Sequence, residues 1–202
     1  MEKPYSPACD NNKGPILEVL KQYITTDNRK LLEIGTGTGQ HAVFLAAEFP
    51  FIDWVTSDRA INHSGIKQWL TEAQVNNVKG PVEFEIGKDE FPKNSFDLVF
   101  TANTFHIMHW KECKSLMKML GHRLREGAQV FIYGPFNYQG QFTSKSNEEF
   151  DRSLKARDPL SGIRAFEDVD TCMKKNGFAF CNDHPMPANN RILVYTRLEF
   201  VK

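Results

Sequence analysis

The sequence predicts an α/β protein with a single doubly wound sheet of seven strands, mostly parallel, with an antiparallel edge strand. Three observations predict this class. Short apolar segments alternate with segments of helical period along most of the 202 residues, which is typical of parallel βαβ units with right-handed crossovers. In LLEIGTGTGQ at 31–40, three glycines at every second position directly follow a short apolar segment. The last two apolar segments have only a turn between them, so we expect them to pair antiparallel.

The N-terminal residues 1–13 are polar, contain two prolines and show no helical period, so we expect an irregular segment. Residues 5–12 either fold over a cofactor as a lid or form a frayed chain end. The first helix should begin at Pro15, because proline is favoured at the first position of a helix and apolar residues follow it at helical spacing.

The remaining elements follow in alternation. Strands are expected at 30–34, 52–58, 82–86, 96–103, 128–136, 178–183 and 191–200. Helices are expected at 41–48, 63–75, 110–125, 146–156 and 165–176, with Gly177 as the C-terminal cap of the last. The polar stretch PANNR at 187–191 is expected to make the turn between the last two strands. In a doubly wound sheet, ligands bind at the carboxyl ends of the strands, and the glycine-rich stretch lies at such an end.

The composition is that of a single globular domain, 1–202, with a sizeable core. Lys and Arg number 25, as do Asp and Glu, so there is no electrostatic signature of nucleic-acid binding. The longest apolar run, 42–47, is far too short to span a bilayer, and the first ten residues lack the apolar core of a signal peptide. The four scattered cysteines are typical of free thiols in a reducing compartment. We therefore expect a cytoplasmic protein that binds neither nucleic acid nor membrane.

The glycine-rich stretch departs from two common phosphate-binding patterns. A P-loop needs a lysine after its last glycine, but Gln40 and His41 follow Gly39. The dinucleotide pattern G-x-G-x-x-G needs a glycine where this chain has Gln40. Neither a nucleotide triphosphate nor a nicotinamide dinucleotide is therefore favoured.

The pattern that remains is E-x-G-x-G-x-G, which begins at Glu33. A carboxylate would repel a pyrophosphate, whereas it suits S-adenosylmethionine, which carries an ammonium and a sulfonium. Glycines also let the backbone approach a ligand without a Cβ in the way. The expected cofactor contacts are Glu33 and the backbone of Gly35, Thr36, Gly37, Thr38 and Gly39. A bare tight turn is the alternative.

Asp58 ends the second predicted strand and supports a nucleoside ligand. A carboxylate at this place can accept hydrogen bonds from both hydroxyls of a ribose. The alternatives are an ion pair with Arg59 or a helix N-cap.

At these residues the chain resembles the class I S-adenosylmethionine-dependent methyltransferases, which have a Rossmann-like fold. The resemblance lies in LLEIGTGTGQ, WVTSD, FPKNSFDLVFTANTFHIMHW and GAQVFIYGPF, and it extends over about residues 12 to 200. Within that class, the segment from YGPFNYQGQF to AFEDV and the stretch MPANNR resemble a narrower family. Its animal members are called methyltransferase-like 26, and its bacterial members carry a domain-of-unknown-function label. The resemblance implies the fold and the cofactor but no acceptor.

The class pattern implies roles for single residues. Glu33 and the glycine loop would face the methionine and ribose portions of the cofactor, and Asp58 would take the ribose hydroxyls. Asp89, which follows the third predicted strand, would meet the adenine amino group, although it is offset from the usual position. Asn103, at the end of the fourth predicted strand, would contact the methionine portion.

His106 is the candidate general base, because it follows the fourth predicted strand and its ordinary pKa lets it act near neutrality. A structural histidine is the alternative. His109 is expected at the surface or at a helix start, and a metal site is not expected because no third ligand has a suitable spacing. Tyr133, Asn137 and Tyr138 are candidates for the walls of an acceptor pocket, with a Gly-Pro turn as the alternative.

These observations predict a methyltransferase that uses S-adenosylmethionine on an unidentified small molecule. The motif of amino-methylating DNA enzymes is absent, since 103–105 read Asn-Thr-Phe. Two alternatives remain: a cofactor-binding interaction protein without catalysis, and an oxidoreductase that uses a nicotinamide dinucleotide. The oligomeric state is left open.

Overall fold

Seven strands form one sheet in the order β3-β2-β1-β4-β5-β9-β8 in the computed structural model, which describes residues 3–199. The pairings of β1 with β2 and β4, and of β2 with β3, are parallel. β9 runs antiparallel to both β5 and β8. The predicted fold class is confirmed. The strands are β1 (Lys30–Ile34), β2 (Asp53–Asp58), β3 (Val78–Glu83), β4 (Leu98–Ala102), β5 (Gln129–Gly134), β8 (Phe178–Met186) and β9 (Asn190–Arg197).

The chain divides into two compact units, Met1–Thr101 and Ala102–Lys202. The expectation of one domain over 1–202 stays a prediction. Among residues 3–199, no helix combines the length and the apolar content that crossing a bilayer requires. The helices are α1 (Pro7–Leu20), α2 (Gln40–Glu48), α3 (His63–Ala73), α4 (Trp110–Arg123), α5 (Lys145–Arg157) and α6 (Phe166–Lys175), with short 3₁₀ turns η1 (Ala60–Asn62) and η2 (Pro187–Asn189).

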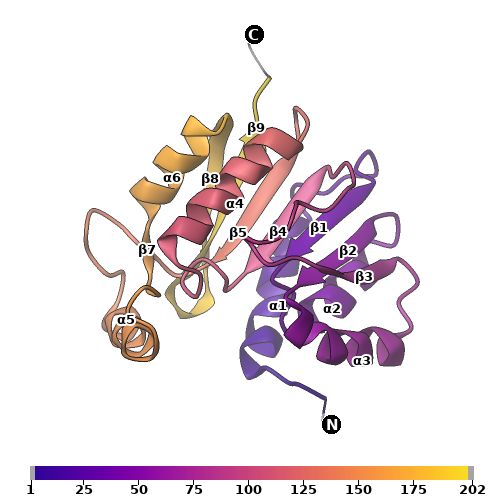
Figure 1. Cartoon of the computed structure of the whole chain (residues 1–202), viewed down its shortest axis with the longest axis horizontal. Helices are drawn as coiled ribbons and strands as arrows, with labels where there is room; N and C mark the ends of the chain where they lie inside the picture. Colours follow the sequence, from indigo (N-terminus) through magenta and orange to yellow (C-terminus); the bar gives the residue numbers. More distant parts are fainter. Residues whose placement is uncertain (1–2, 200–202) are drawn as a thin grey trace. The chain divides into compact units, whose positions relative to one another are not determined.

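In the N-terminal unit, three helices lie side by side with α2 between α1 and α3 (Figure 1). α2 packs on β2 and β3, and α3 packs on β3. β1 is buried on both faces, as expected of a central parallel strand, and its Leu31, Leu32 and Ile34 join the core. The largest fully buried side chains of this unit are Trp54, Phe96 and Phe100.

The predicted start of the first helix is wrong. α1 begins at Pro7, which occupies one of its first two positions, so residues 7–13 are helical rather than irregular, and Pro15 lies inside the helix. These polar residues have partners that a sequence pattern does not reveal. Asn12 is buried, and its Oδ1 lies 2.6 Å from Nε2 of His41 on α2. Contacts with α2, rather than an apolar stripe, therefore hold the first two turns.

The third strand also differs from its prediction at 82–86, because β3 begins at Val78 and ends at Glu83. Gly80 and Pro81 therefore lie inside the strand, where a proline is tolerated because β3 is an edge strand. Gly80 has a φ of +111°, and a Cβ there would come within 2.6 Å of Thr56 Oγ1. Glycine is therefore needed at position 80, because a side chain there would clash with Thr56 on the neighbouring strand β2.

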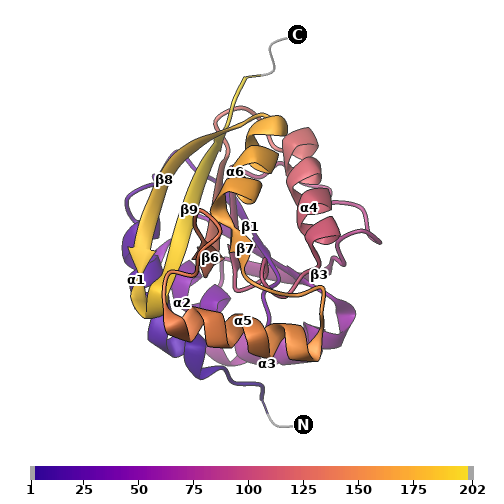
Figure 2. The ribbon, with the colours of Figure 1, turned by 90° about the vertical axis from the view of Figure 1, so that its left-hand side faces the viewer.

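In the C-terminal unit, α4 and α6 lie side by side, and α6 packs on β8 (Figures 1 and 2). α5 lies beyond the carboxyl end of β8 (Figure 2), where Asn147 Nδ2 donates a hydrogen bond of 3.2 Å to the Asn189 carbonyl. Two short strands, β6 (Phe136–Asn137) and β7 (Arg164–Ala165), form a separate parallel pair. The predicted turn between β8 and β9 is confirmed at 187–189, although 190 and 191 already belong to β9, and the cap at Gly177, with a φ of +81°, is confirmed.

Two helical glycines give a matched pair of stability predictions. A Cβ at Gly121 of α4 would overlap with the Asn176 carbonyl oxygen beyond α6, so Gly121→Ala should destabilise by about 1–3 kcal/mol. A Cβ at Gly14 of α1 would meet nothing within 4 Å, so Gly14→Ala should stabilise by about 0.5–1 kcal/mol. Urea unfolding measures both. Equal effects of the two substitutions would contradict the close approach at Asn176.

Candidate functional site

The glycine loop is tied to the end of β2 by backbone hydrogen bonds. The N–H groups of Gly35 and Thr36 donate to the Ser57 carbonyl at 3.0 and 3.1 Å, and the Ser57 N–H donates to Thr36 Oγ1 at 3.2 Å. Gly35, Gly37 and Gly39 all have positive φ, at 69°, 65° and 100°. Residues other than glycine rarely adopt that backbone conformation. The loop is therefore a fixed structure rather than a flexible turn.

The glycines of the loop serve two different purposes. A Cβ at Gly39 would lie 3.1 Å from Trp69 Cβ and 3.3 Å from Ile66 Cα, so this glycine lets α3 approach closely. A Cβ at Gly37 would meet no protein atom nearer than 4.0 Å. Gly37 instead lines a hollow of about 390 Å³, a volume within the range of small-molecule pockets. The hollow is lined by Pro4, Gly37, Thr38, Ile61, Asn62, Ser64, Gly65 and Gln68.

Asp58 is buried at the end of β2, and its carboxylate organises the backbone around it. Oδ2 accepts the Gly37 N–H at 2.7 Å, and Oδ1 accepts from the Arg59 N–H at 2.7 Å and from Asn62 Nδ2 at 2.8 Å. Asp58 therefore bonds the backbone of Arg59 rather than its guanidinium. Each carboxylate oxygen accepts about two hydrogen bonds, which leaves acceptor capacity mainly on Oδ2. The expected contact of Asp58 with a ribose stays a prediction.

Glu33 is only 2% exposed, and its Oε2 accepts a 2.8 Å hydrogen bond from Trp54 Nε1. Burial raises the pKa of the carboxyl group to about 8, the indole hydrogen bond opposes this rise, and the negative charge of Asp58 adds to it. The group therefore carries a proton at neutral pH in the protein as it stands. The sequence predicts that a charged Glu33 attracts the cationic groups of S-adenosylmethionine. Glu33 can do so only after it has lost that proton.

Asp89 and Asn103 both lie at bends after strands. The Asp89 carboxylate accepts the Glu85 N–H at 2.6 Å and so closes a turn after β3. Asn103 follows β4 with a φ of +58°, and its N–H donates to the Tyr133 carbonyl at 2.9 Å. Their expected contacts with adenine and methionine stay predictions.

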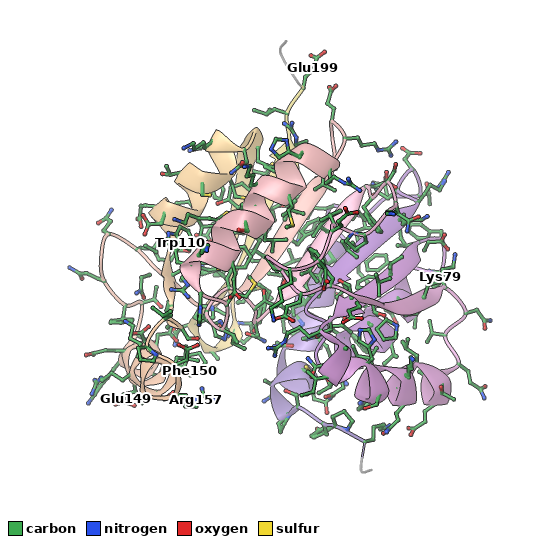
Figure 3. The ribbon with its side chains drawn as sticks, viewed as in Figure 1. Lys79, Trp110, Glu149, Phe150, Arg157 and Glu199 are labelled. Carbon is green, nitrogen blue, oxygen red and sulfur yellow. The ribbon has the colours of Figure 1, made fainter. Side chains whose placement is uncertain are left out.

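His106 lies in the C-terminal unit and is 4% exposed. Its ring meets Phe150 of α5 edge to face, with centroids 5.3 Å apart, and Figure 3 shows Phe150 on the same helix as Arg157. A Cβ on Gly134, at the end of β5, would lie 3.5 Å from its Nδ1. Burial lowers the pKa of His106 to about 4, and the positive charges of Arg164 and Arg157 add to this effect. The imidazole is therefore neutral but a much weaker base than the ordinary histidine that the sequence led us to expect.

His109 is half-exposed and is the N-cap of α4, whose first residue is Trp110 (labelled in Figure 3). It forms a capping box with Glu112, and its Nε2 lies 2.7 Å from Asp158 Oδ2. The expectation of a histidine at a helix start is confirmed. His109 is thus bound to a carboxylate, while His106 packs against an aromatic ring.

The three candidate residues for an acceptor pocket have different surroundings. Tyr133 is buried in β5. The Tyr138 hydroxyl donates to Asp183 Oδ2 at 2.6 Å, and burial and Asp183 raise the pKa of Tyr138. Asn137 differs, because its Oδ1 is buried without a hydrogen-bond partner among the described residues. Such an atom is a candidate to accept a hydrogen bond from a ligand.

Sequence reasoning missed two features of the N-terminal unit. Gln40 was noted only as a missing glycine, yet its buried side chain bonds the backbone of Ser6. A second buried set links α1 to α2, since His41 Nδ1 lies 3.7 Å from Cys9 Sγ. Burial lowers the pKa of His41 to about 4 and raises the pKa of Cys9, so both groups are neutral and the thiol is not an activated nucleophile. All four cysteines are free thiols, as predicted.

Comparison with known proteins agrees with the fold. Residues 3–197 match the family described as "Protein of unknown function (DUF938)". A malonyl-[acyl-carrier protein] O-methyltransferase of Paenibacillus sp. (strain JDR-2) is 28% identical over 142 residues, which are 65% of this chain and 50% of that protein. The chain therefore spans about half the length of this curated relative.

Two solved structures are similar in fold at low sequence identity. An O-methyltransferase family 2 protein from Planctomyces limnophilus DSM 3776, in complex with apigenin, gives a TM-score of 0.81 at 14% identity, covering 93% of this chain and 57% of that one. PigF with S-adenosylhomocysteine gives a TM-score of 0.78 at 12% identity. The match covers 91% of this chain and 55% of PigF. The chain also spans little more than half the length of these proteins. At such identity the likeness shows the fold alone.

The buried Glu33 predicts a pH dependence of stability. The pKa of Glu33 in the folded protein is about 8, above the ordinary value of 4.5. Its favourable contribution is therefore complete below pH 4.5 and is lost as the pH rises towards 8, because only the unfolded chain ionises freely there. The wild type should lose stability relative to Glu33→Gln by up to about 1.4 kcal/mol per pH unit. Denaturant unfolding at pH 5, 6.5 and 8 measures this difference.

Glu126→Gln is the matched control, because Glu126 is exposed and its substitution removes the same charge. The change with pH in the difference from the wild type should be larger for Glu33→Gln than for Glu126→Gln. Equal changes with pH in the two variants would contradict a protonated Glu33.

Proposed function

We propose that this chain, which belongs to the family of proteins of unknown function DUF938, transfers the methyl group of S-adenosylmethionine to a small molecule. The observation that carries this proposal is the open side of Gly37, next to Asp58 and on a hollow of about 390 Å³. The methyltransferase names of the similar proteins support it, as does the S-adenosylhomocysteine in PigF.

The residues of the N-terminal unit fit the parts of this cofactor. The missing Cβ of Gly37 leaves space for a ligand against the loop, and Asp58 Oδ2 has capacity for a ribose hydroxyl. Asn62 lines the same hollow and holds Asp58 in place. S-adenosylmethionine supplies an electrophilic methyl group on a sulfonium. The protein's task is then to hold an acceptor in line with that methyl, which by itself can provide much of the acceleration.

Gln40 argues against a nicotinamide dinucleotide. A dinucleotide places its pyrophosphate at the N-terminus of the helix that follows the glycine loop. Here Gln40 begins that helix, and its side chain is 3% exposed and bonded to the backbone of Ser6. An amide oxygen and a neighbouring stretch of chain thus lie beside the place where phosphates would need N–H donors.

Two of the candidate acceptor residues, His106 and Asn137, belong to the C-terminal unit. His106 is a buried neutral imidazole beside Phe150, and the side-chain oxygen of Asn137 has no hydrogen-bond partner within residues 3–199. Such surroundings suit a small, partly apolar acceptor that is positioned by a few polar groups. Since a histidine with a pKa of about 4 is a weak base, positioning would contribute more than proton removal.

The cofactor is tested by isothermal titration calorimetry. S-adenosylhomocysteine should bind with a dissociation constant on the order of micromolar, about −8 kcal/mol, and NADH should not bind. Asp58→Asn should weaken the binding of S-adenosylhomocysteine roughly 10- to 100-fold, because the ligand loses a hydrogen bond to a charged acceptor. Lys21→Ala, on the exposed end of α1, is the control. Preferential binding of NADH would overturn the proposal.

The role of His106 is tested by substitution and by pH. In His106→Ala, S-adenosylhomocysteine affinity should stay near that of the wild type, and turnover of an identified acceptor should fall by less than the roughly 10²- to 10⁴-fold that is typical of losing a general base. The wild-type rate should be flat from pH 6 to 9 and fall only towards pH 4, because burial lowers the pKa of His106 to about 4. Imidazole NMR signals measure that pKa directly. Full turnover in the variant would end the base role, and loss of binding would indicate a structural histidine.

A further inference from the structure

The N-terminal stretch 3–6 lies against the hollow beside the glycine loop. Pro4 lines the hollow, and its carbonyl accepts a 2.7 Å hydrogen bond from Trp69 Nε1 of α3. Lys3 Nζ lies 3.8 Å from the centroid of the Trp69 ring, and Lys3 also forms an ion pair with Glu72. The stretch is therefore attached to α3 by a backbone hydrogen bond, a cation–π contact and a charge pair.

The surface of α3 is shaped to receive this stretch. Gly65 is buried, and a Cβ there would overlap with the Pro4 ring. Gly65 and Trp69 are four residues apart and so share one face of the helix. One residue makes room for Pro4 and the other bonds its carbonyl.

Gln40 holds the other end of the stretch. Its Oε1 accepts the Ser6 N–H at 2.6 Å, and its Nε2 donates to the Ser6 carbonyl at 3.2 Å. Thr38 Oγ1 donates to the same Oε1 at 3.0 Å, which fixes the orientation of the amide. The side chain that replaces the third glycine of a dinucleotide pattern thus satisfies both backbone groups of Ser6 and connects them to the glycine loop.

We propose that residues 3–6 form the outer wall of the cofactor cleft and that Gln40 is a positioning residue that keeps this wall closed. The inference rests on the proposed function, because it takes the hollow beside Gly37 as part of the cofactor site. Cofactor entry and departure then require the Gln40–Ser6 pair to open. Gln40 contributes through Ser6 rather than by touching the reacting atoms.

The test compares Gln40→Ala with the matched control Gln22→Ala, which truncates an exposed glutamine of the same unit. The first readout needs no cofactor: hydrogen exchange at the amides of 3–9 should be about 10-fold faster in Gln40→Ala and unchanged in Gln22→Ala. The second is stopped-flow dissociation of S-adenosylhomocysteine, which should also be about 10-fold faster in Gln40→Ala, or about 1.4 kcal/mol. Trp69→Phe, which removes the hydrogen bond to Pro4 and weakens the cation–π contact with Lys3, should move both readouts in the same direction.

The outcomes separate this inference from the proposed function. A wild type that binds no S-adenosylhomocysteine overturns the proposed function. A wild type that binds it, with both variants dissociating at the wild-type rate, overturns the wall alone. Faster amide exchange without faster dissociation also overturns the wall, since the stretch would then open without affecting the ligand. Trp69→Phe keeps the inference testable if Gln40→Ala does not fold.

Discussion

The Asp58 carboxylate is the constraint on which the rest of the candidate site depends. It joins the glycine loop at Gly37, the beginning of η1 at Arg59 and the hollow at Asn62 through three hydrogen bonds. A hydrogen bond to a charged group contributes about 1.5–3 kcal/mol, so these contacts outweigh the tendency of a glycine-rich loop to be flexible. With the loop held at positive φ, Gly37 opens onto the hollow and Gly39 packs on α3.

Burial has the same electrostatic consequence at three titratable groups. It raises the pKa of Glu33 to about 8 and lowers those of His41 and His106 to about 4. Each group is therefore neutral at pH 7, and each has a nearby partner: Trp54 for Glu33, Asn12 for His41 and the Phe150 ring for His106. Burial thus leaves no strong acid or base among these three groups.

The sequence was most informative where local pattern and tertiary environment agree. β1 was predicted with its observed bounds, because KLLEI is a short apolar run bounded by polar residues and glycine, and it is buried on both faces. The cap at Gly177 was also predicted, since a positive φ after a helix favours glycine. Among the candidate site residues, the loop at 35–39 and Asp58 could be placed from spacing alone, because both follow strands that run parallel in one sheet.

The sequence by itself determined the alternation of strands and helices, the glycine loop and the acid after the second strand. These features depend on interactions within a few residues: helical period, apolar runs and the backbone freedom of glycine. Only the tertiary structure decided that α1 begins at Pro7, that β3 passes through Gly80 and Pro81, and that Gln40 bonds Ser6. Each of these depends on a partner far away in the chain, and no local pattern encodes the burial or the hydrogen bond that such a partner supplies.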